Sequence, residues 1–209
     1  MTARSKYIVF EGPDSCGKSE AMVEMKKRLS ELAGVDCFKT PSYDGPVGRL
    51  IRQIFAGTAK VSPYAMMHLF NADAIDQEAF VKRRLSKGRH VILDRHTRIS
   101  SCIYQVDFHP MSVVLGNLPV SLFKRVDLCV VLDASNETLS QRIKARENKL
   151  TDRMYTSADH SRLQTLRDRY AVSRHLHSDL VDKWLYLSTD DPENTPESIA
   201  RLCCTVLGL

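Results

Sequence analysis

The sequence predicts an α/β fold of three layers, in which a five-stranded parallel sheet is flanked by helices. Short apolar runs alternate with longer segments of helical periodicity, an order typical of parallel sheets with both faces covered. A glycine-containing loop joins the first apolar run to the first helical segment. Both observations favour a single domain that spans residues 1–209, since no linker, repeat or low-complexity tract interrupts the pattern.

Five apolar runs and the segments between them define the expected elements. The predicted strands cover residues 6–11, 36–39, 90–94, 127–133 and 184–188. Helices are expected over residues 17–33, 47–55, 63–86, 136–146 and 158–178. Thr195, followed by Pro196 and Glu197, predicts the start of a last helix by supplying a cap, a first-position proline and a first-turn acid. Residues 107–125 are the least regular and are expected to be partly loop.

Composition indicates an ordinary globular protein of 209 residues, with 43% hydrophobic and 26% charged residues. No apolar run approaches the roughly eighteen residues of a membrane span, and the apolar stretch after residue 6 is too short for a signal peptide. The six cysteines form no CxxC pair, which favours a reducing compartment. We therefore predict a cytoplasmic location and no membrane partner.

The formal net charge of +5 is compatible with two kinds of partner. A basic surface can bind nucleic acid, whereas a basic pocket can bind the phosphates of a small molecule. Lysine and arginine are scattered along the chain and form no basic tract. This distribution favours the phosphate pocket, and no nucleic-acid partner is expected.

Residues 12–19, with the sequence GPDSCGKS, match the phosphate-loop pattern GxxxxGK[ST] between a strand and a helix. Backbone N–H groups of such a loop and of the following helix face phosphates. Lys18 is expected to reach the β and γ phosphates of ATP, and the Ser19 hydroxyl to bind Mg²⁺. The predicted architecture is therefore a P-loop NTPase fold with ATP and Mg²⁺ as cofactors. The expected cofactor-binding residues are Gly12, Asp14, Ser15, Cys16, Gly17, Lys18, Ser19 and Arg142.

Other P-loop classes fit less well. Residues 148–151 approach the guanine-reading pattern NKxD, but Thr151 stands where the acid is required. No DxxG sequence follows the third strand, because Asp94 is followed by Arg95, His96 and Thr97. A motor or AAA-type ATPase is disfavoured by the short chain and by the basic acceptor site described next.

Several segments resemble thymidylate kinases. Residues 10–19, FEGPDSCGKS, resemble their FEGxDGxGKS/T opening, and Asp94-Arg95-His96 with Ser100 and Tyr104 resembles their DR[YH]xxSxxAYQ segment. Residues 152–159 and the Arg-Tyr pair at 169–170 resemble the end of their lid and the next helix. The resemblance implies phosphorylation of dTMP to dTDP, a mobile lid at about residues 144–156, and a homodimer.

Arg95 follows directly after a strand, where it can clamp the acceptor phosphate, and Asp94 at the strand end can hold Mg²⁺. A surface ion pair and a strand-end cap are the alternative interpretations of these two residues. The resemblance implies that Asp14 meets the sugar hydroxyl and that Phe70 stacks on the base, although aromatic side chains on helices are more often core residues. The full set expected at the acceptor is Asp14, Tyr43, Phe70, Arg95, Arg98, Ser100 and Tyr104.

Members of the resembled family place a catalytic arginine either in the phosphate loop or in the lid. Ser15 occupies the loop position here, so the lid is expected to supply the cation. The lid segment is rich in basic residues, which elsewhere would indicate only a solvated helix face: Arg142, Lys144, Arg146, Lys149 and Arg153. The predicted catalytic residues are Lys18, Arg95, Arg146 and Arg153.

Two positions depart from the family pattern, and both lie in the expected acceptor pocket. Ala74 stands four residues after Phe70, where the family usually has an arginine that reads the thymine edge, and Thr40 replaces a phenylalanine. Arg98 is the candidate replacement for the missing cation. The alternatives are a kinase for dUMP or a 5-substituted analogue and a nucleic-acid-directed P-loop kinase. The presence of Lys18 and Arg95 disfavours a non-catalytic nucleotide-binding module.

Overall fold

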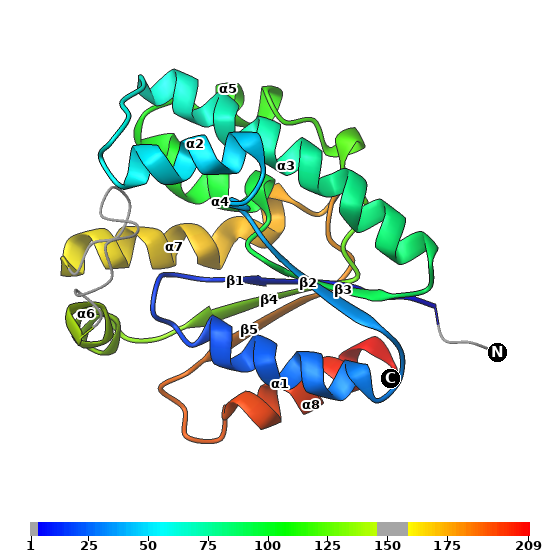
Figure 1. Cartoon of the computed structure of the whole chain (residues 1–209). Coiled ribbons are helices and arrows are strands. Elements are labelled where there is room, and N and C mark those ends of the chain that lie inside the picture. The colour runs from blue at the N-terminus through cyan, green and yellow to red at the C-terminus, as the bar shows by residue number, and fades with distance from the viewer. Residues whose placement is uncertain (1–3, 146–158) are drawn as a thin grey trace.

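The computed structural model describes residues 4–145 and 159–209. Five parallel strands form one sheet in the order β2-β3-β1-β4-β5. Their bounds are β1 Tyr7–Glu11, β2 Val35–Lys39, β3 His90–Asp94, β4 Leu128–Asp133 and β5 Trp184–Ser188. Helices cover both faces of the sheet, which is seen nearly edge-on in Figure 1. The predicted three-layer α/β fold is confirmed.

The central strand β1 explains how the sequence builds the core. All five of its residues are buried, and it pairs with β3 on one side and β4 on the other. Side chains alternate between the two faces of a strand. Ile8 and Phe10 accordingly belong to one apolar cluster, while Tyr7 and Val9 belong to the cluster on the opposite face.

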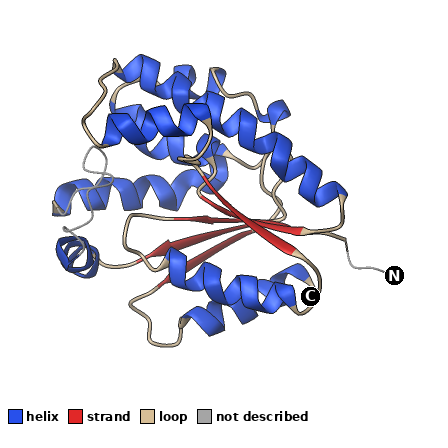
Figure 2. Ribbon diagram, viewed as in Figure 1, coloured by secondary structure: helices blue, strands red, loops and turns tan. Residues whose placement is uncertain are grey.

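The helices divide between the two faces of the sheet (Figure 2). Helices α1 (Lys18–Ser30) and α8 (Pro196–Leu207) pack on each other and cover one face. The opposite face carries α3 (Pro63–Ser86), α4 (Thr97–Tyr104) and α7 (His160–Leu176). Helix α2 (Pro46–Phe55) packs on α3, and α6 (Asn136–Ala145) packs on α7.

Several predicted helix boundaries are confirmed by their caps. The Thr195 hydroxyl accepts a hydrogen bond from the Ser198 N–H at the start of α8. Helix α3 begins and ends at the predicted residues, whereas α7 spans His160–Leu176, two residues shorter at each end than the predicted 158–178, with Asp159 as its N-cap. The irregular region 107–125 holds short elements: η1 (Gln105–Asp107) reaches into it, and α5 (Met111–Gly116) and η2 (Val120–Leu122) follow.

Parallel strands place their carboxyl ends at the same edge of a sheet. Glu11 ends β1, Asp94 ends the neighbouring β3, and Asp133 ends β4 on the other side. The loops that follow these strands therefore meet there, which is where open α/β sheets bind ligands. Within the described ranges, no helix is both long and apolar enough to cross a membrane.

Candidate active site

The phosphate loop between β1 and α1 depends on glycine at two positions. Gly12 has φ of 134°, and a Cβ built there would lie 2.0 Å from the Leu132 carbonyl oxygen. Gly17 has φ of 91° and caps α1 in the left-handed conformation. Both values fall where L side chains are strained. The loop can therefore run close against β4 and turn directly into the helix N-terminus.

Lys18 directs its ammonium group back into the loop. Its Nζ donates hydrogen bonds to the carbonyl oxygens of Gly12 at 3.0 Å and Pro13 at 2.7 Å, and lies 3.6 Å from Cys16 Sγ. The side chain is buried, whereas Ser19 in the first turn of α1 is exposed. A cation beside the amino end of a helix makes an anion site. The structure thus brings together the loop residues that the sequence predicts.

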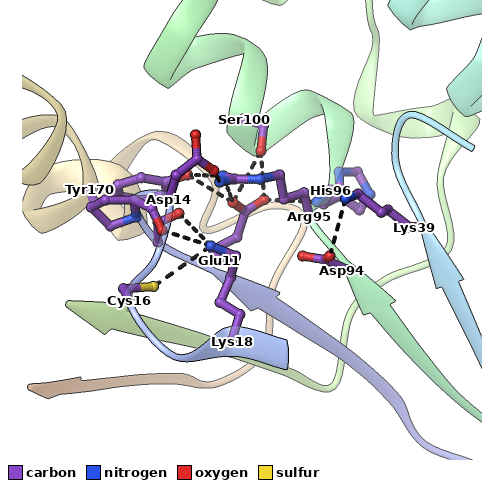
Figure 3. A network of polar contacts seen from close by, with 12 residues as sticks. Glu11, Asp14, Cys16, Lys18, Lys39, Asp94, Arg95, His96, Ser100 and Tyr170 are labelled. Carbon is purple, nitrogen blue, oxygen red and sulfur yellow. Dashed lines mark hydrogen bonds and ion pairs between the residues drawn. The ribbon is translucent and has the colours of Figure 1, made fainter. Parts of the chain in front are cut away.

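Arg95 lies next to the phosphate loop and has several partners. Its backbone has φ of 68°, and its N–H donates to the Phe10 carbonyl oxygen at 2.9 Å. One guanidinium nitrogen donates to Asp14 Oδ1 at 2.6 Å and the other to the Tyr170 hydroxyl at 2.8 Å (Figure 3). The guanidinium also lies over the Tyr104 ring, 5.3 Å from its centroid. These contacts fix a planar, bidentate donor beside the loop.

Glu11 is the buried centre of this network. Its carboxylate accepts hydrogen bonds from the His96 N–H at 2.7 Å, from the Ser100 hydroxyl at 3.0 and 3.1 Å, and from the Tyr170 hydroxyl at 3.1 Å. Arg95 NH1 lies 3.8 Å from the same carboxylate. Burial raises the pKa of Glu11, while the positive charge of Arg95 opposes that shift. Ser100, predicted to meet the substrate, here orients Glu11.

Sequence reasoning assigned no role to Glu11 or Tyr170. An acid that ends an otherwise apolar buried strand was a usable signal for Glu11, since a buried carboxylate needs partners. Tyr170 gave a weaker signal, as an aromatic residue on a helix is usually core. Its bond to Glu11 spans 159 residues of sequence, so no local pattern reveals it.

Asp94 offers oxygen atoms at the end of β3. Its Oδ1 is buried and has no hydrogen-bond partner among the described residues, and its Oδ2 lies 4.0 Å from Lys39 Nζ. Within residues 4–145 and 159–209, no group of three or more His, Cys, Asp or Glu side chains is arranged so that it could hold a metal ion. Mg²⁺ needs no such group, because it is bound by oxygen ligands from one or two side chains, substrate phosphates and water. Asp94 and the Ser19 hydroxyl fit that donor set.

Aromatic side chains gather where α2 meets α3. The ring of Phe70 lies 6.1 Å from that of Phe55, which in turn lies 6.2 Å from that of Tyr43. Phe70 is 9% exposed and packs against Ile51 and Met66. The predicted residues Tyr43 and Phe70 thus share one cluster, which offers an apolar platform for a flat ring.

A buried carboxylate fastens the loop after β2 to helix α3. Asp73 accepts hydrogen bonds from the Ser42 N–H at 2.8 Å and from the Ser42 hydroxyl at 2.5 Å. Gln77 donates to the same carboxylate at 3.0 Å and to the Lys39 carbonyl oxygen at 2.7 Å. Asp73 and Gln77 therefore hold the loop that carries Tyr43 against the helix that carries Phe70.

Arg98 is buried in the first turn of α4. Its guanidinium donates to the carbonyl oxygens of Leu115 at 3.2 Å and of Leu118, so it ties α4 to the region of α5. Ala74 is buried on α3. A base-reading role for Arg98 would require the guanidinium to leave these carbonyl groups, and that role stays a prediction.

Arg142 on α6 reaches the phosphate loop, and its predicted contact with the cofactor stays a prediction. Its NH1 donates to the Ser15 carbonyl oxygen at 3.3 Å and to the Thr189 hydroxyl at 3.1 Å. The two predicted lid arginines, Arg146 and Arg153, lie outside the described residues, as does most of the expected lid. Their catalytic role stays a prediction.

Comparison with known proteins decides the family. A family model described as thymidylate kinase matches residues 10–178 of the chain. The chain belongs to the thymidylate kinase family. As a member of that family it is a phosphotransferase that acts on a nucleoside monophosphate.

Two archaeal relatives and one solved structure support the assignment. The probable thymidylate kinase of Methanocaldococcus jannaschii is 32% identical over 146 residues, which cover 68% of this chain and 71% of that protein. A probable thymidylate kinase of Methanococcus maripaludis is 30% identical over 156 residues, covering 72% and 71%. The thymidylate kinase of Candida albicans superposes with a TM-score of 0.71 at 17% identity, covering all of this chain and 93% of that chain. At that identity the structural match shows the fold alone.

Proposed function

We propose that the protein transfers the γ-phosphoryl group of ATP to dTMP and so forms dTDP and ADP. The main support is the placement of Arg95, whose guanidinium is held beside the phosphate loop by Asp14 and Tyr170. An arginine fixed there can hold an acceptor phosphate next to the donor phosphates. Phosphoryl transfer depends mainly on such positioning and on charge stabilisation.

Each charged group has one task in this reaction. Lys18 stabilises negative charge on the β and γ phosphates of ATP, which the loop N–H groups also bind. Arg95 neutralises and orients the acceptor phosphate, whose oxygen attacks the γ-phosphorus as the bond to the β-phosphate oxygen breaks. Asp14, already bonded to Arg95, is the candidate partner of the acceptor sugar hydroxyl.

Mg²⁺ would be held by Ser19 and Asp94 together with the nucleotide phosphates, and when bound it neutralises phosphate charge. The two lid arginines remain the proposed source of the transition-state cation, because the phosphate loop carries Ser15 at the alternative position. Arg142 is the proposed contact between α6 and the bound donor, since it already touches the loop.

The aromatic cluster supports an acceptor with a flat base, and the pyrimidine identity is proposed from the family. Phe70 is the proposed stacking partner of the base, with Phe55 beside it and Tyr43 next to Phe55. Tyr104 lies against Arg95 and is the proposed neighbour of the deoxyribose, where it would disfavour a 2′-hydroxyl. Ala74 and Thr40 stand where the family usually has an arginine and a phenylalanine beside the base. The residues present therefore define the preferred base less closely than they define the phosphate site.

The test is a transfer assay with a panel of acceptors. Purified protein is incubated with ATP and Mg²⁺ and one of dTMP, dUMP, dCMP, dAMP, TMP or a short oligonucleotide, and the products are identified by mass. We expect dTDP to form faster than any purine product and faster than the ribonucleotide TDP. Phosphorylation of the oligonucleotide with no dTDP would refute the proposal and support a nucleic-acid-directed kinase.

A further inference from the structure

A small cavity lies between α3, the first residues of α4 and the end of β2. Its volume is about 10 Å³, roughly what one water molecule or one hydroxyl group needs. Among the side chains that line it are those of Thr40, Ala74, Glu78, His96, Thr97 and Phe123. Both positions that depart from the family pattern, Thr40 and Ala74, therefore face the same space.

The lining of the cavity includes residues that are close in sequence to both parts of the proposed acceptor site. Ala74 stands one helical turn after Phe70, and residues four apart lie on the same face of a helix. His96 directly follows Arg95, the proposed phosphate clamp. A base stacked on Phe70, with its phosphate on Arg95, would therefore point one edge toward the cavity.

Two polar atoms on side chains that line the cavity have no partner. Thr97 Oγ1 and His96 Nε2 are buried and make no hydrogen bond to any residue that the structure describes. The side chains are deeply buried, since Thr97 is 5% and His96 1% exposed. Buried polar atoms are nearly always paired with protein, water or a ligand, because leaving them unpaired is destabilising.

The histidine offers a donor at this place. His96 Nδ1 accepts the Arg98 N–H at 3.3 Å, and burial lowers the pKa of the ring to about 3. The neutral ring therefore carries its hydrogen on Nε2, the atom without a partner. The Thr97 hydroxyl can donate or accept, so the pair suits a hydroxyl group, which does both.

We propose that this cavity is a subsite for a polar group attached through one carbon to position 5 of a pyrimidine acceptor. The acceptor class is thus a 5-hydroxymethyl-type deoxyuridine monophosphate, preferred over an apolar analogue of equal size. Phe70 and Ala74 lie one turn apart on the same helix face, where neighbouring Cβ atoms are about 5–6 Å apart. On a base stacked against Phe70, a substituent two atoms long reaches farther toward Ala74 than an oxygen atom bonded directly to the ring. The inference rests on the proposed function, because it assigns the base edge of the same acceptor site.

The contrast between a hydroxyl and a methyl group gives the subsite its selectivity. A hydroxyl in the cavity takes the place of a water and pairs with His96 and Thr97. An ethyl group expels the water and leaves both atoms unpaired, and sites with buried polar groups reject analogues that lack the matching group. dTMP, whose methyl group is shorter, leaves room for the water and stays a substrate.

The experiment is a competition between 5-hydroxymethyl-dUMP and 5-ethyl-dUMP, which differ only by a hydroxyl and a methyl group, with dTMP as reference. We expect kcat/KM for the hydroxymethyl compound to exceed that for the ethyl compound by at least about 10-fold. Thr97→Val keeps the shape and removes one hydroxyl, so it should reduce this ratio by about 2- to 12-fold, the range of one neutral hydrogen bond. Thr205→Val, on the exposed side of α8, is the matched control and should leave the ratio unchanged.

Two further readouts make the test decisive. Ala74→Val adds side-chain volume at the wall of this small cavity and should reduce the hydroxymethyl preference. Calorimetric binding of the two nucleotides measures the same ratio without turnover. A wild-type ratio near one, or a ratio that Thr97→Val leaves unchanged, overturns the subsite even where dTDP forms normally. If no nucleoside monophosphate is phosphorylated, the proposed function fails and the subsite fails with it.

Discussion

The hydroxyl of Tyr170 connects two charged groups of the active site, so Tyr170→Phe is a sharp perturbation. It accepts a hydrogen bond from Arg95 at 2.8 Å and donates one to Glu11 at 3.1 Å. Removing it deprives a buried carboxylate of one donor and a guanidinium of one acceptor. Loss of partners to buried charged groups costs about 1–3 kcal/mol, and we expect the free energy of unfolding to fall by that amount.

The same change should alter one kinetic parameter in particular. Arg95 retains Asp14 but loses the contact that fixes its other nitrogen, so the proposed phosphate clamp becomes less ordered. A loss of about 1.4 kcal/mol corresponds to a tenfold change. We therefore expect the acceptor KM to rise about tenfold, with the ATP KM nearly unchanged, because Lys18 and the loop are untouched.

Urea denaturation and steady-state kinetics with varied acceptor or ATP measure both effects. Tyr186→Phe is the matched control, because the hydroxyl of this half-buried tyrosine lies 3.3 Å from the neutral Ser173 hydroxyl, one turn along α7 from Tyr170, and the removed contact involves no charged group. The control should change the unfolding free energy by less than about 1.5 kcal/mol and leave the kinetics unchanged. If Tyr170→Phe matched the control in both measurements, Tyr170 would not position Arg95 and the network would be only a packing feature.

Three further changes test other parts of the site. Lys18→Ala should lower kcat by about 100-fold or more while circular dichroism stays native, since it removes a charge-stabilising contact; near-normal turnover would exclude that role. Phe70→Ala should raise the acceptor KM by about 5- to 150-fold, the equivalent of one stacking contact, without a comparable change for ATP; a change in the ATP KM alone would place Phe70 elsewhere. Burial raises the pKa of Glu78 from 4.5 to about 7, so its protonated form is favoured by folding, and the free energy of unfolding should fall as pH rises through that interval. In urea titrations at pH 4.5 and 7.5, Glu78→Gln should reduce that fall by about 1–3 kcal/mol, and an unchanged pH dependence would contradict the shift.

The sheet was predictable because its strands are short, apolar and bounded by polar residues. Strands β3 and β5 match the predicted residues, and β1, β2 and β4 differ by one residue at the amino end. Continuous apolar runs are the direct consequence of burial on both faces. Helices α4 and α5 were not predicted, because elements of 8 and 6 residues give too short a periodic signal.

The residues proposed to bind phosphate were predicted better than the residues that hold them in place. Lys18, Asp14 and Arg95 stand in motifs, and the structure brings them together as expected. Tyr170 acts through a contact with a residue 159 positions away, which no local pattern encodes, whereas Glu11 was marked only as an acid at the end of an apolar strand. For Arg98 the sequence did not reveal that its guanidinium is bonded to backbone carbonyl groups, and its proposed contact with the base stays a prediction.

The two sides of the acceptor site are built from different interactions, and this separates reaction from specificity. The phosphate side is held by charged hydrogen bonds that centre on Glu11 and Arg95, so a change there alters several partners at once. The base side is held by apolar packing around Phe70, and the cavity beside Ala74 borders it. A substitution at position 74 or 97 changes the volume and polarity of that cavity without removing any of the hydrogen bonds that hold Arg95. One or two substitutions on the base side can therefore shift base preference without altering the residues proposed for phosphoryl transfer. We propose that the departures at Thr40 and Ala74 act in this way.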